Sequence, residues 1–172
     1  MKILLGIFLC LVSLSGGLQA QSPEEKLKEL GIELPAIGNP IANYVHVVQS
    51  GKLLFLSGKG PSDKNGKYIT GKVGKELSVE EGQAAARLTA INQLSVLKAS
   101  TGDLGKVKRI LKVLGMVNCG DDFTDHPKVI NGFSDLMVAV FGEKGKHARS
   151  AVGMCSLPGN MAVEIEMVVE LE

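Results

Sequence analysis

The stretch "KVKRILKVLGMVN", residues Lys106–Asn118, decides the fold class of this chain. Its core, from Ile110 to Val117, is apolar on both faces instead of alternating between apolar and polar residues. This pattern is typical of a central strand that is covered on both sides of its sheet. The fold then depends on which other segments can supply the two covers.

Two long helices are predicted, one before this strand and one after it. A capping box at Ser78–Glu81 opens the first helix, which runs to about Ser100. Its apolar residues recur at helical spacing and predict one face packed on a sheet: Ala84, Leu88, Ile91, Leu94 and Leu97. Pro127 begins the second helix, which carries a wide apolar stripe and ends at Gly142.

The remaining segments predict four more strands and a short leading helix. The stretch "NYVHVVQSGKLLFLSG" (43–58) indicates a hairpin that turns at Ser50-Gly51. The last two strands are predicted at Arg149–Ser156 and Ala162–Leu171, and the turn "CSLPGN" between them favours antiparallel pairing. A second capping box opens the short helix Pro23–Leu30.

The resulting order of elements, α-ββ-α-β-α-ββ, leaves one face of the sheet without a cover. Two long helices can cover only one face of a sheet of this size. Another copy of the chain is the simplest source of the second cover for the central strand. We therefore predict an α+β domain that oligomerises through its sheet.

The first 20 residues have the pattern of a secretory signal peptide. Lys2 supplies a short positive region, and Ile3–Leu14 form an apolar run that is too short to span a membrane. Ser15–Ala20 form the small, polar region that precedes the expected cleavage site. We expect a secreted or periplasmic protein that has no membrane segment after cleavage. Residues 21–36 then form a helical extension, and residues 37–172 form the domain.

The composition argues against nucleic acid as a partner. The 172 residues carry 19 Lys and Arg against 18 Asp and Glu, a net charge of +1, and they include no Trp. Removal of Lys2 with the signal peptide would bring the net charge to zero, since all 18 acidic residues remain. A neutral chain with few aromatics lacks both an electrostatic footprint for phosphates and a stacking platform for bases.

Metal and nucleotide motifs are also absent from the sequence. Neither GxxxxGK[ST] nor a GxGxxG after a strand occurs, and there is no CxxC. Two cysteines follow the signal peptide, Cys119 and Cys155. We interpret both as small buried hydrophobes. A disulfide between them is the alternative, because an exported protein can form one.

Arg149 is the residue whose role the spacing leaves open. It stands at the head of a small-residue strand, and Glu164 and Glu166 lie on one face of the next strand, about 7 Å apart. In an antiparallel hairpin Arg149 would lie nearer Glu170 than Glu164. Spacing alone favours a surface ion pair worth under about 1 kcal/mol over a clamp for a small carboxylate.

Three stretches resemble the RidA/YjgF family of imine and enamine deaminases. They are "NYVHVVQSGKLLFLSGKGP", "VINGFSDLMVAVFG" and, most specifically, "ARSAVGMCSLPGNMAVEIEMVVEL". The resemblance covers roughly residues 37–171. It implies a chorismate-mutase-like fold, with a mixed sheet, two long helices on one face, and a homotrimer whose sites lie between subunits. It also implies a reaction that needs no cofactor and no metal.

The resemblance assigns roles to five residues. Arg149 would hold the carboxylate of a 2-imino acid, and Glu164 would position the water that hydrolyses it to a 2-keto acid and ammonia. Tyr44, Ser57 and Asn131 would line the substrate site.

The chain departs from the family pattern at three positions. Ala151 stands where a cysteine is frequent, Lys59 where a glutamine is usual after Ser-Gly, and Asn43 where a proline precedes the tyrosine. Three functions follow as hypotheses: imine deamination, a binding module for small carboxylates without turnover, and the family's ribonuclease activity. The near-neutral net charge and the scarcity of aromatic residues disfavour the ribonuclease hypothesis.

Overall fold

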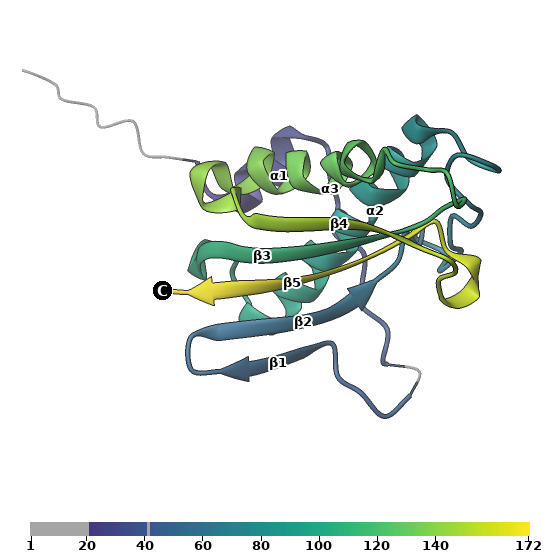
Figure 1. Cartoon of the computed structure of the whole chain (residues 1–172). Coiled ribbons are helices and arrows are strands. Elements are labelled where there is room, and N and C mark those ends of the chain that lie inside the picture. The colour runs from purple at the N-terminus through teal and green to yellow at the C-terminus, as the bar shows by residue number, and fades with distance from the viewer. Residues whose placement is uncertain (1–20, 41) are drawn as a thin grey trace, which may run out of the picture.

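The computed structural model describes residues 21–40 and 42–172 (Figure 1). The predicted signal peptide lies outside the described residues. Within the described part of the chain, no helix is long and apolar enough to cross a membrane.

One mixed sheet of five strands forms the centre of the molecule (Figure 1). Its strand order is β1-β2-β5-β3-β4, and β3 pairs parallel with β4 while the other neighbours pair antiparallel. The strands are, in chain order, Val47–Ser50, Leu53–Lys59, Val107–Asn118, Ala148–Met154 and Val163–Leu171. The doubly apolar stretch is thus the long β3, which has a strand on either side, as predicted.

The two long helices, α2 (Val79–Thr101) and α3 (His126–Phe141), cover the same face of the sheet (Figure 1). The short α1 (Pro23–Glu29) packs beside α3 and buries Leu27 in the core. Short 3-10 turns complete the described elements: η1 (Leu104–Lys106), η2 (Gly142–Gly145) and η3 (Pro158–Asn160). The prediction of an α+β fold with both long helices on one face is confirmed.

Both predicted capping boxes form. Ser22 begins α1 and Ser78 begins α2, and each side chain accepts from the backbone N–H three residues along while the glutamate there bonds back. Gly102, with φ of 71°, ends α2 in the left-handed conformation that glycine adopts without a Cβ penalty. The helix starts were predictable because these signals are local.

The buried face of α2 differs from the predicted one. Ala84 is exposed, and the buried side includes the polar residues Asn92 and Gln93. The Gln93 side-chain amide donates to Ser57 O at 3.0 Å and to Ile165 O at 2.7 Å. Polar residues are tolerated there because they are hydrogen-bonded: Gln93 bonds to β2 and β5 near the bulge in β2, and Asn92 donates to Gly60 O and Ser62 O in the loop after β2.

The predicted hairpin between the last two strands was wrong. Strand β4 lies at the edge of the sheet, parallel to β3, while β5 is inserted between β2 and β3. The connection between them passes the end of β3, where Asn118 donates to the side chain of Asn160 at 2.9 Å. The strand with the more regular apolar face, β5, buries Val163, Ile165, Met167 and Val169 and so takes the central position.

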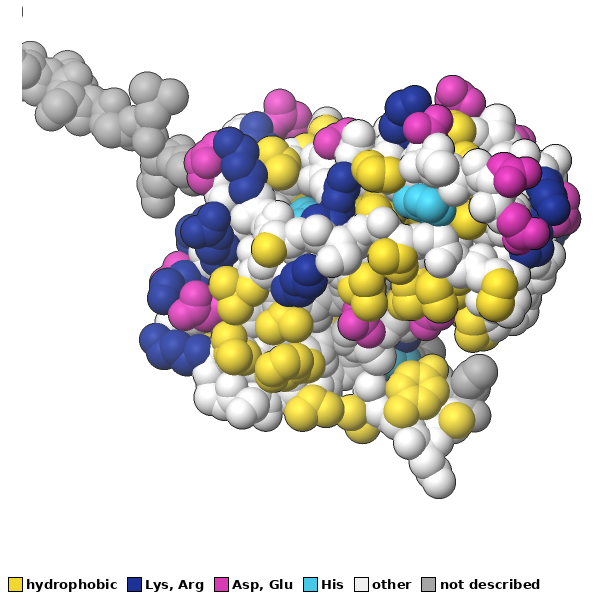
Figure 2. All heavy atoms as spheres, in the orientation of Figure 1, with side chains coloured by type: hydrophobic (Ala, Val, Ile, Leu, Met, Phe, Trp, Pro, Cys, Tyr) yellow, Lys and Arg dark blue, Asp and Glu magenta, His cyan; other side chains and the backbone are white. Residues whose placement is uncertain are grey.

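The second face of the sheet carries exposed apolar side chains (Figure 2). Val48 is 55% exposed, Phe55 45% and Val152 39%, and Leu114 and Met116 of β3 are only partly buried. Among the described residues, no helix lies over this face (Figure 1). We call it the open face.

Candidate functional site

Arg149 lies on the edge strand β4 and points to the helix side of the sheet. Its register partner on β3 is Val113, which is fully buried beneath the helices. The guanidinium donates to Asn131 Oδ1 at 2.9 Å and to Ser134 Oγ at 3.0 Å, both on α3, and to Pro127 O at 3.4 Å. The structure therefore brings together two of the predicted site residues, Arg149 and Asn131.

All three of these acceptors are uncharged. Among the described residues, no carboxylate forms an ion pair with Arg149. The surface ion pair that spacing favoured is thus not formed within the chain. A half-buried guanidinium, held in place but without a counter-charge, is suited to binding a carboxylate from outside the chain.

His147 supports this arrangement through Ser134. Burial lowers the pKa of His147, and the neighbouring charge of Arg149 lowers it further. In the neutral ring, Nδ1 donates to Gly145 O at 2.7 Å, because a carbonyl can only accept. Nε2 then accepts from the Ser134 hydroxyl at 3.1 Å, and the Ser134 oxygen accepts from Arg149. We call Arg149, Asn131, Ser134 and His147 the arginine half-site.

Sequence reasoning missed Ser134 as part of this group. A signal was present, because Ser134 follows Asn131 by three residues on a helix and so lies on the same face. His147 precedes Arg149 by only two residues in the sequence. Its connection through Ser134 depends on how β4 packs on α3.

Glu164 lies on the open face, half-buried, near the start of β5. Its carboxylate packs against Gly58 of β2, at a place where any Cβ would collide with the Glu164 side chain. Burial raises the pKa of Glu164, and the charge of Glu166 raises it further. We call Ser57, Gly58 and Glu164 the glutamate half-site.

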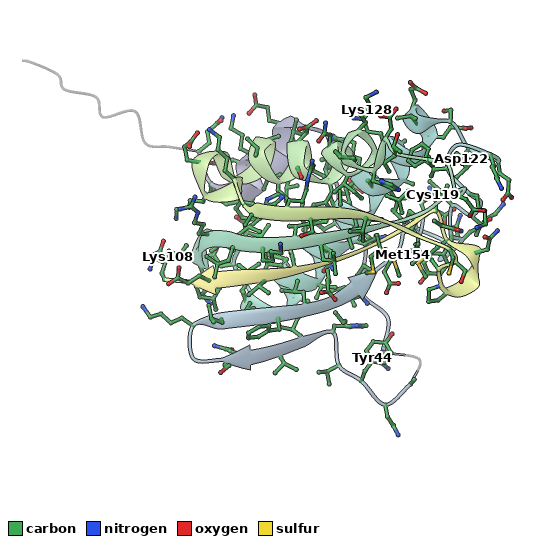
Figure 3. The ribbon with its side chains drawn as sticks, in the orientation of Figure 1. Tyr44, Lys108, Cys119, Asp122, Lys128 and Met154 are labelled. Atoms are coloured by element: carbon green, nitrogen blue, oxygen red, sulfur yellow. The ribbon has the colours of Figure 1, made fainter. Side chains whose placement is uncertain are left out.

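Tyr44 adjoins the glutamate half-site through His46, which contacts both Tyr44 and Ser57. The Ser57 hydroxyl donates to His46 O at 3.2 Å, and the Tyr44 ring packs edge-on against the His46 ring at 6.3 Å. Tyr44 itself is 46% exposed on the loop before β1 (Figure 3). These two predicted residues therefore belong to one region of the chain, away from Arg149.

The structure does not bring Arg149 and Glu164 together in one chain. Glu164 is in register with Met116 of β3, three residues beyond Val113, the partner of Arg149. Because Val113 and Met116 are an odd number of residues apart on β3, their register partners Arg149 and Glu164 point to opposite faces of the sheet. Two strand spacings, about 10 Å, also separate β4 from β5.

The two cysteines of the described chain are both free. Cys119 is buried, and its sulfur lies 3.4 Å from His126 Nε2, while burial raises the pKa of its thiol. Cys155 is exposed, so the interpretation of both as buried hydrophobes was wrong for Cys155. Cys155 follows β4 directly and lies in the connection to β5, where no helix covers it.

The sheet order, the helices on one face and the packing of Glu164 against Gly58 define an α+β protein of the chorismate-mutase-like class. Residues 24–171 match the family described as "YjgF/chorismate_mutase-like, putative endoribonuclease". The chain belongs to this family, RidA/YjgF, as the resemblance of its sequence predicted.

Individual relatives cover most of the chain. It is 48% identical over 146 residues to the protein TCP17 of Trypanosoma cruzi, covering 84% of this chain and 91% of that protein. It is 31% identical over 142 residues to a 2-iminobutanoate/2-iminopropanoate deaminase of Dermatophagoides farinae, covering 82% and 95%. Among solved structures, Atu1372 of Agrobacterium tumefaciens, a protein of unknown function, superposes with a TM-score of 0.80 at 46% identity, covering 87% and 94%.

Proposed function

We propose that this protein hydrolyses small 2-imino acids to 2-keto acids and ammonia. The observation that carries the proposal is the guanidinium of Arg149, which is fixed by three uncharged acceptors and has no carboxylate partner among the described residues. Its remaining N–H groups suit a substrate carboxylate. The similarity to a protein named as a 2-iminobutanoate/2-iminopropanoate deaminase supports the same reaction.

Glu164 is the base in this proposal. Its raised pKa makes the carboxylate a better proton acceptor near neutral pH. Water attacks the electrophilic imine carbon and gives its proton to Glu164. Glu164 passes this proton to the nitrogen, which gives a carbinolamine, and the carbinolamine hydroxyl then gives up its own proton, through Glu164, to the same nitrogen. The C–N bond breaks, ammonia leaves, and a 2-keto acid remains that Arg149 still holds.

The site would be completed by two copies of the chain. The arginine half-site and the glutamate half-site lie on opposite faces, so one protomer cannot close both on one substrate. Two different surfaces that meet form a heterologous contact, which closes into a ring when the rotation allows it. The resemblance to the family favours a ring of three, with the open face of each copy covered by the next.

A complementation experiment tests the shared site. Arg149→Ala and Glu164→Gln should each abolish imine hydrolysis, measured on imines that an amino-acid oxidase generates. When the two variants are co-expressed in equal amounts, the whole preparation should recover about a quarter of the wild-type rate, because random assembly pairs an intact arginine with an intact glutamate at about a quarter of the sites. No recovery in folded mixed oligomers would contradict a site between subunits.

The same proteins distinguish turnover from binding alone. Glu164→Gln should lower turnover more than it weakens the binding of pyruvate. Wild-type protein that binds pyruvate but accelerates no imine hydrolysis would make the chain a carboxylate-binding module instead. Export by the N-terminal signal remains part of the proposal, and it implies an imine source outside the cytoplasm.

A further inference from the structure

A cavity of about 480 Å³ lies on the other side of β2 from the glutamate half-site. It lies between the loop before β1, the end of β2 with the loop that follows it, and the helix α2, and its lining includes Tyr44, His46, Lys59, Tyr68 and Asn92. Gly58 faces Glu164, whereas the register of Lys59 with the buried Ile165 places Lys59 on the helix side. The cavity therefore lies across β2 from Glu164, and it shares Tyr44 and His46 with the loop that adjoins the glutamate half-site.

Lys59 is hydrogen-bonded within this cavity to an imidazole of defined orientation. Its Nζ lies 2.8 Å from His46 Nδ1, and His46 Nε2 lies 2.8 Å from Gly38 O. A carbonyl oxygen can only accept, so in the neutral ring Nε2 carries the hydrogen and Nδ1 presents its lone pair to the amine. A proton acceptor is thereby fixed beside a primary amine.

In the described part of the chain, no acidic side chain forms a salt bridge with this amine, although Asp63 also lines the cavity. Burial lowers the pKa of Lys59. An ammonium that loses solvent without gaining a counter-charge gives up its proton more readily, and the neutral amine is a nucleophile.

The backbone on both sides of Lys59 is held in place. The Gln93 side chain donates to Ser57 O at 3.0 Å, and the Asn92 side chain donates to Gly60 O at 3.0 Å. Both donors come from the rigid helix α2, so the position of the amine in the cavity is set by the fold and not by a mobile loop.

We propose that Lys59 is the amine of a second site, which condenses with small ketones or aldehydes that enter this cavity. The nitrogen attacks the carbonyl carbon, and His46 Nδ1 takes a proton from the nitrogen. His46 returns this proton to the carbonyl oxygen, which also takes the second hydrogen of the amine and leaves as water, and a C=N bond remains. No oxidant or reductant is needed.

The chemistry of the walls favours an uncharged ligand. The rings of Tyr44 and Tyr68 and the side chain of Ile37 supply apolar surface. Asp63 and Lys64, of opposite charge, are the other acidic and basic groups on the described lining, besides Lys59 and His46. A small neutral carbonyl compound fits this surface better than an anion does.

Pentane-2,4-dione is a direct probe of this site, because it condenses with unprotonated lysines to a stable, ultraviolet-absorbing enaminone. We expect Lys59 to be labelled at least about tenfold faster than Lys52 at near-neutral pH, measured by peptide mass spectrometry on the wild-type protein. Lys52, in the turn between β1 and β2, is the exposed internal reference. Labelling of Lys59 no faster than that of Lys52 would overturn the proposal.

Variants separate the amine from its base. Lys59→Gln, which restores the residue usual in the family, should remove the fast phase of labelling, while Lys52→Gln should leave it unchanged. His46→Gln should slow the labelling of Lys59 severalfold without abolishing it. A fast phase that survives Lys59→Gln would assign the reactivity to another amine, and this outcome is independent of imine hydrolysis by Arg149.

Discussion

At the scale of the residue, Glu164 shows how position sets chemistry. The carboxylate packs against Gly58, which has no side chain, and is half-buried as a result. Burial raises its pKa, and Glu166 on the same face of β5 raises it further. Sequence spacing predicted that the two glutamates share a face, but the burial comes from β2, which lies more than 100 residues earlier in the chain.

Glu166→Gln should shift the acid limb of the kcat/KM profile for imine hydrolysis to lower pH. The base form of Glu164 is needed for activity, and removal of the neighbouring charge lowers the pKa of Glu164. The matched control is Glu170→Gln, since Glu170 on the same strand pairs with Lys108 at 2.8 Å. An acid limb that stays in place in Glu166→Gln would contradict the role of Glu164.

The same pKa shift has a defined effect on stability. Because the pKa of Glu164 is raised in the folded chain, its contribution to stability is fully present below the pKa of the unfolded chain. That contribution is lost as the pH rises through the folded value. In Glu164→Gln the side chain stays neutral and this loss does not occur. An ionised base at this position therefore lowers the stability of the folded chain.

At the scale of the element, the buried side of α2 and the pairing of the last two strands are the features that short-range sequence signals did not predict. The capping boxes and the glycine stops predicted where the helices begin and end, because those signals act within a few residues. The buried side of α2 was misjudged because Asn92 and Gln93 bond to segments that are distant in sequence: Gln93 to β2 and β5, and Asn92 to the loop after β2. The hairpin was misjudged because a short connection does not require its two strands to be neighbours.

Gln93→Met should lower the free energy of unfolding by about 1–3 kcal/mol. The change leaves Ser57 O and Ile165 O without their donor, and it is partly offset because the buried Gln93 Oε1 has no partner of its own. Denaturant unfolding measures the change. Ala84→Gln, on the exposed side of the same helix, should shift the value by less than about 0.5 kcal/mol, and equal losses would contradict the account.

At the scale of the whole molecule, the open face connects the fold to the proposed activity. It exposes Val48, Phe55 and Val152 on a sheet whose other face is covered by the two long helices (Figure 2). The glutamate half-site lies on this face, and the arginine half-site lies behind the edge strand β4. An assembly that covers the open face with the edge of the next copy would complete the site.

Val152→Asp should therefore convert the oligomer to a monomer and lower imine hydrolysis by at least about tenfold. Light scattering after size-exclusion chromatography measures the assembly, and circular dichroism checks that the chain is folded. Leu30→Asp is the control, because Leu30 is 41% exposed but lies at the end of α1, in the helical layer. A folded, fully active oligomer in Val152→Asp would exclude the open face as the interface.

The sequence by itself determined the helix boundaries, the interior place of Lys106–Asn118 in the sheet, the single helical layer and the family. These follow from short-range capping, from hydrophobic pattern and from quoted motifs. Only the tertiary structure decided the strand order, the uncharged partners of Arg149 and the burial of Glu164 and Lys59. The physical reason is that pairing and burial arise between segments far apart in the chain, where many arrangements satisfy the same local pattern.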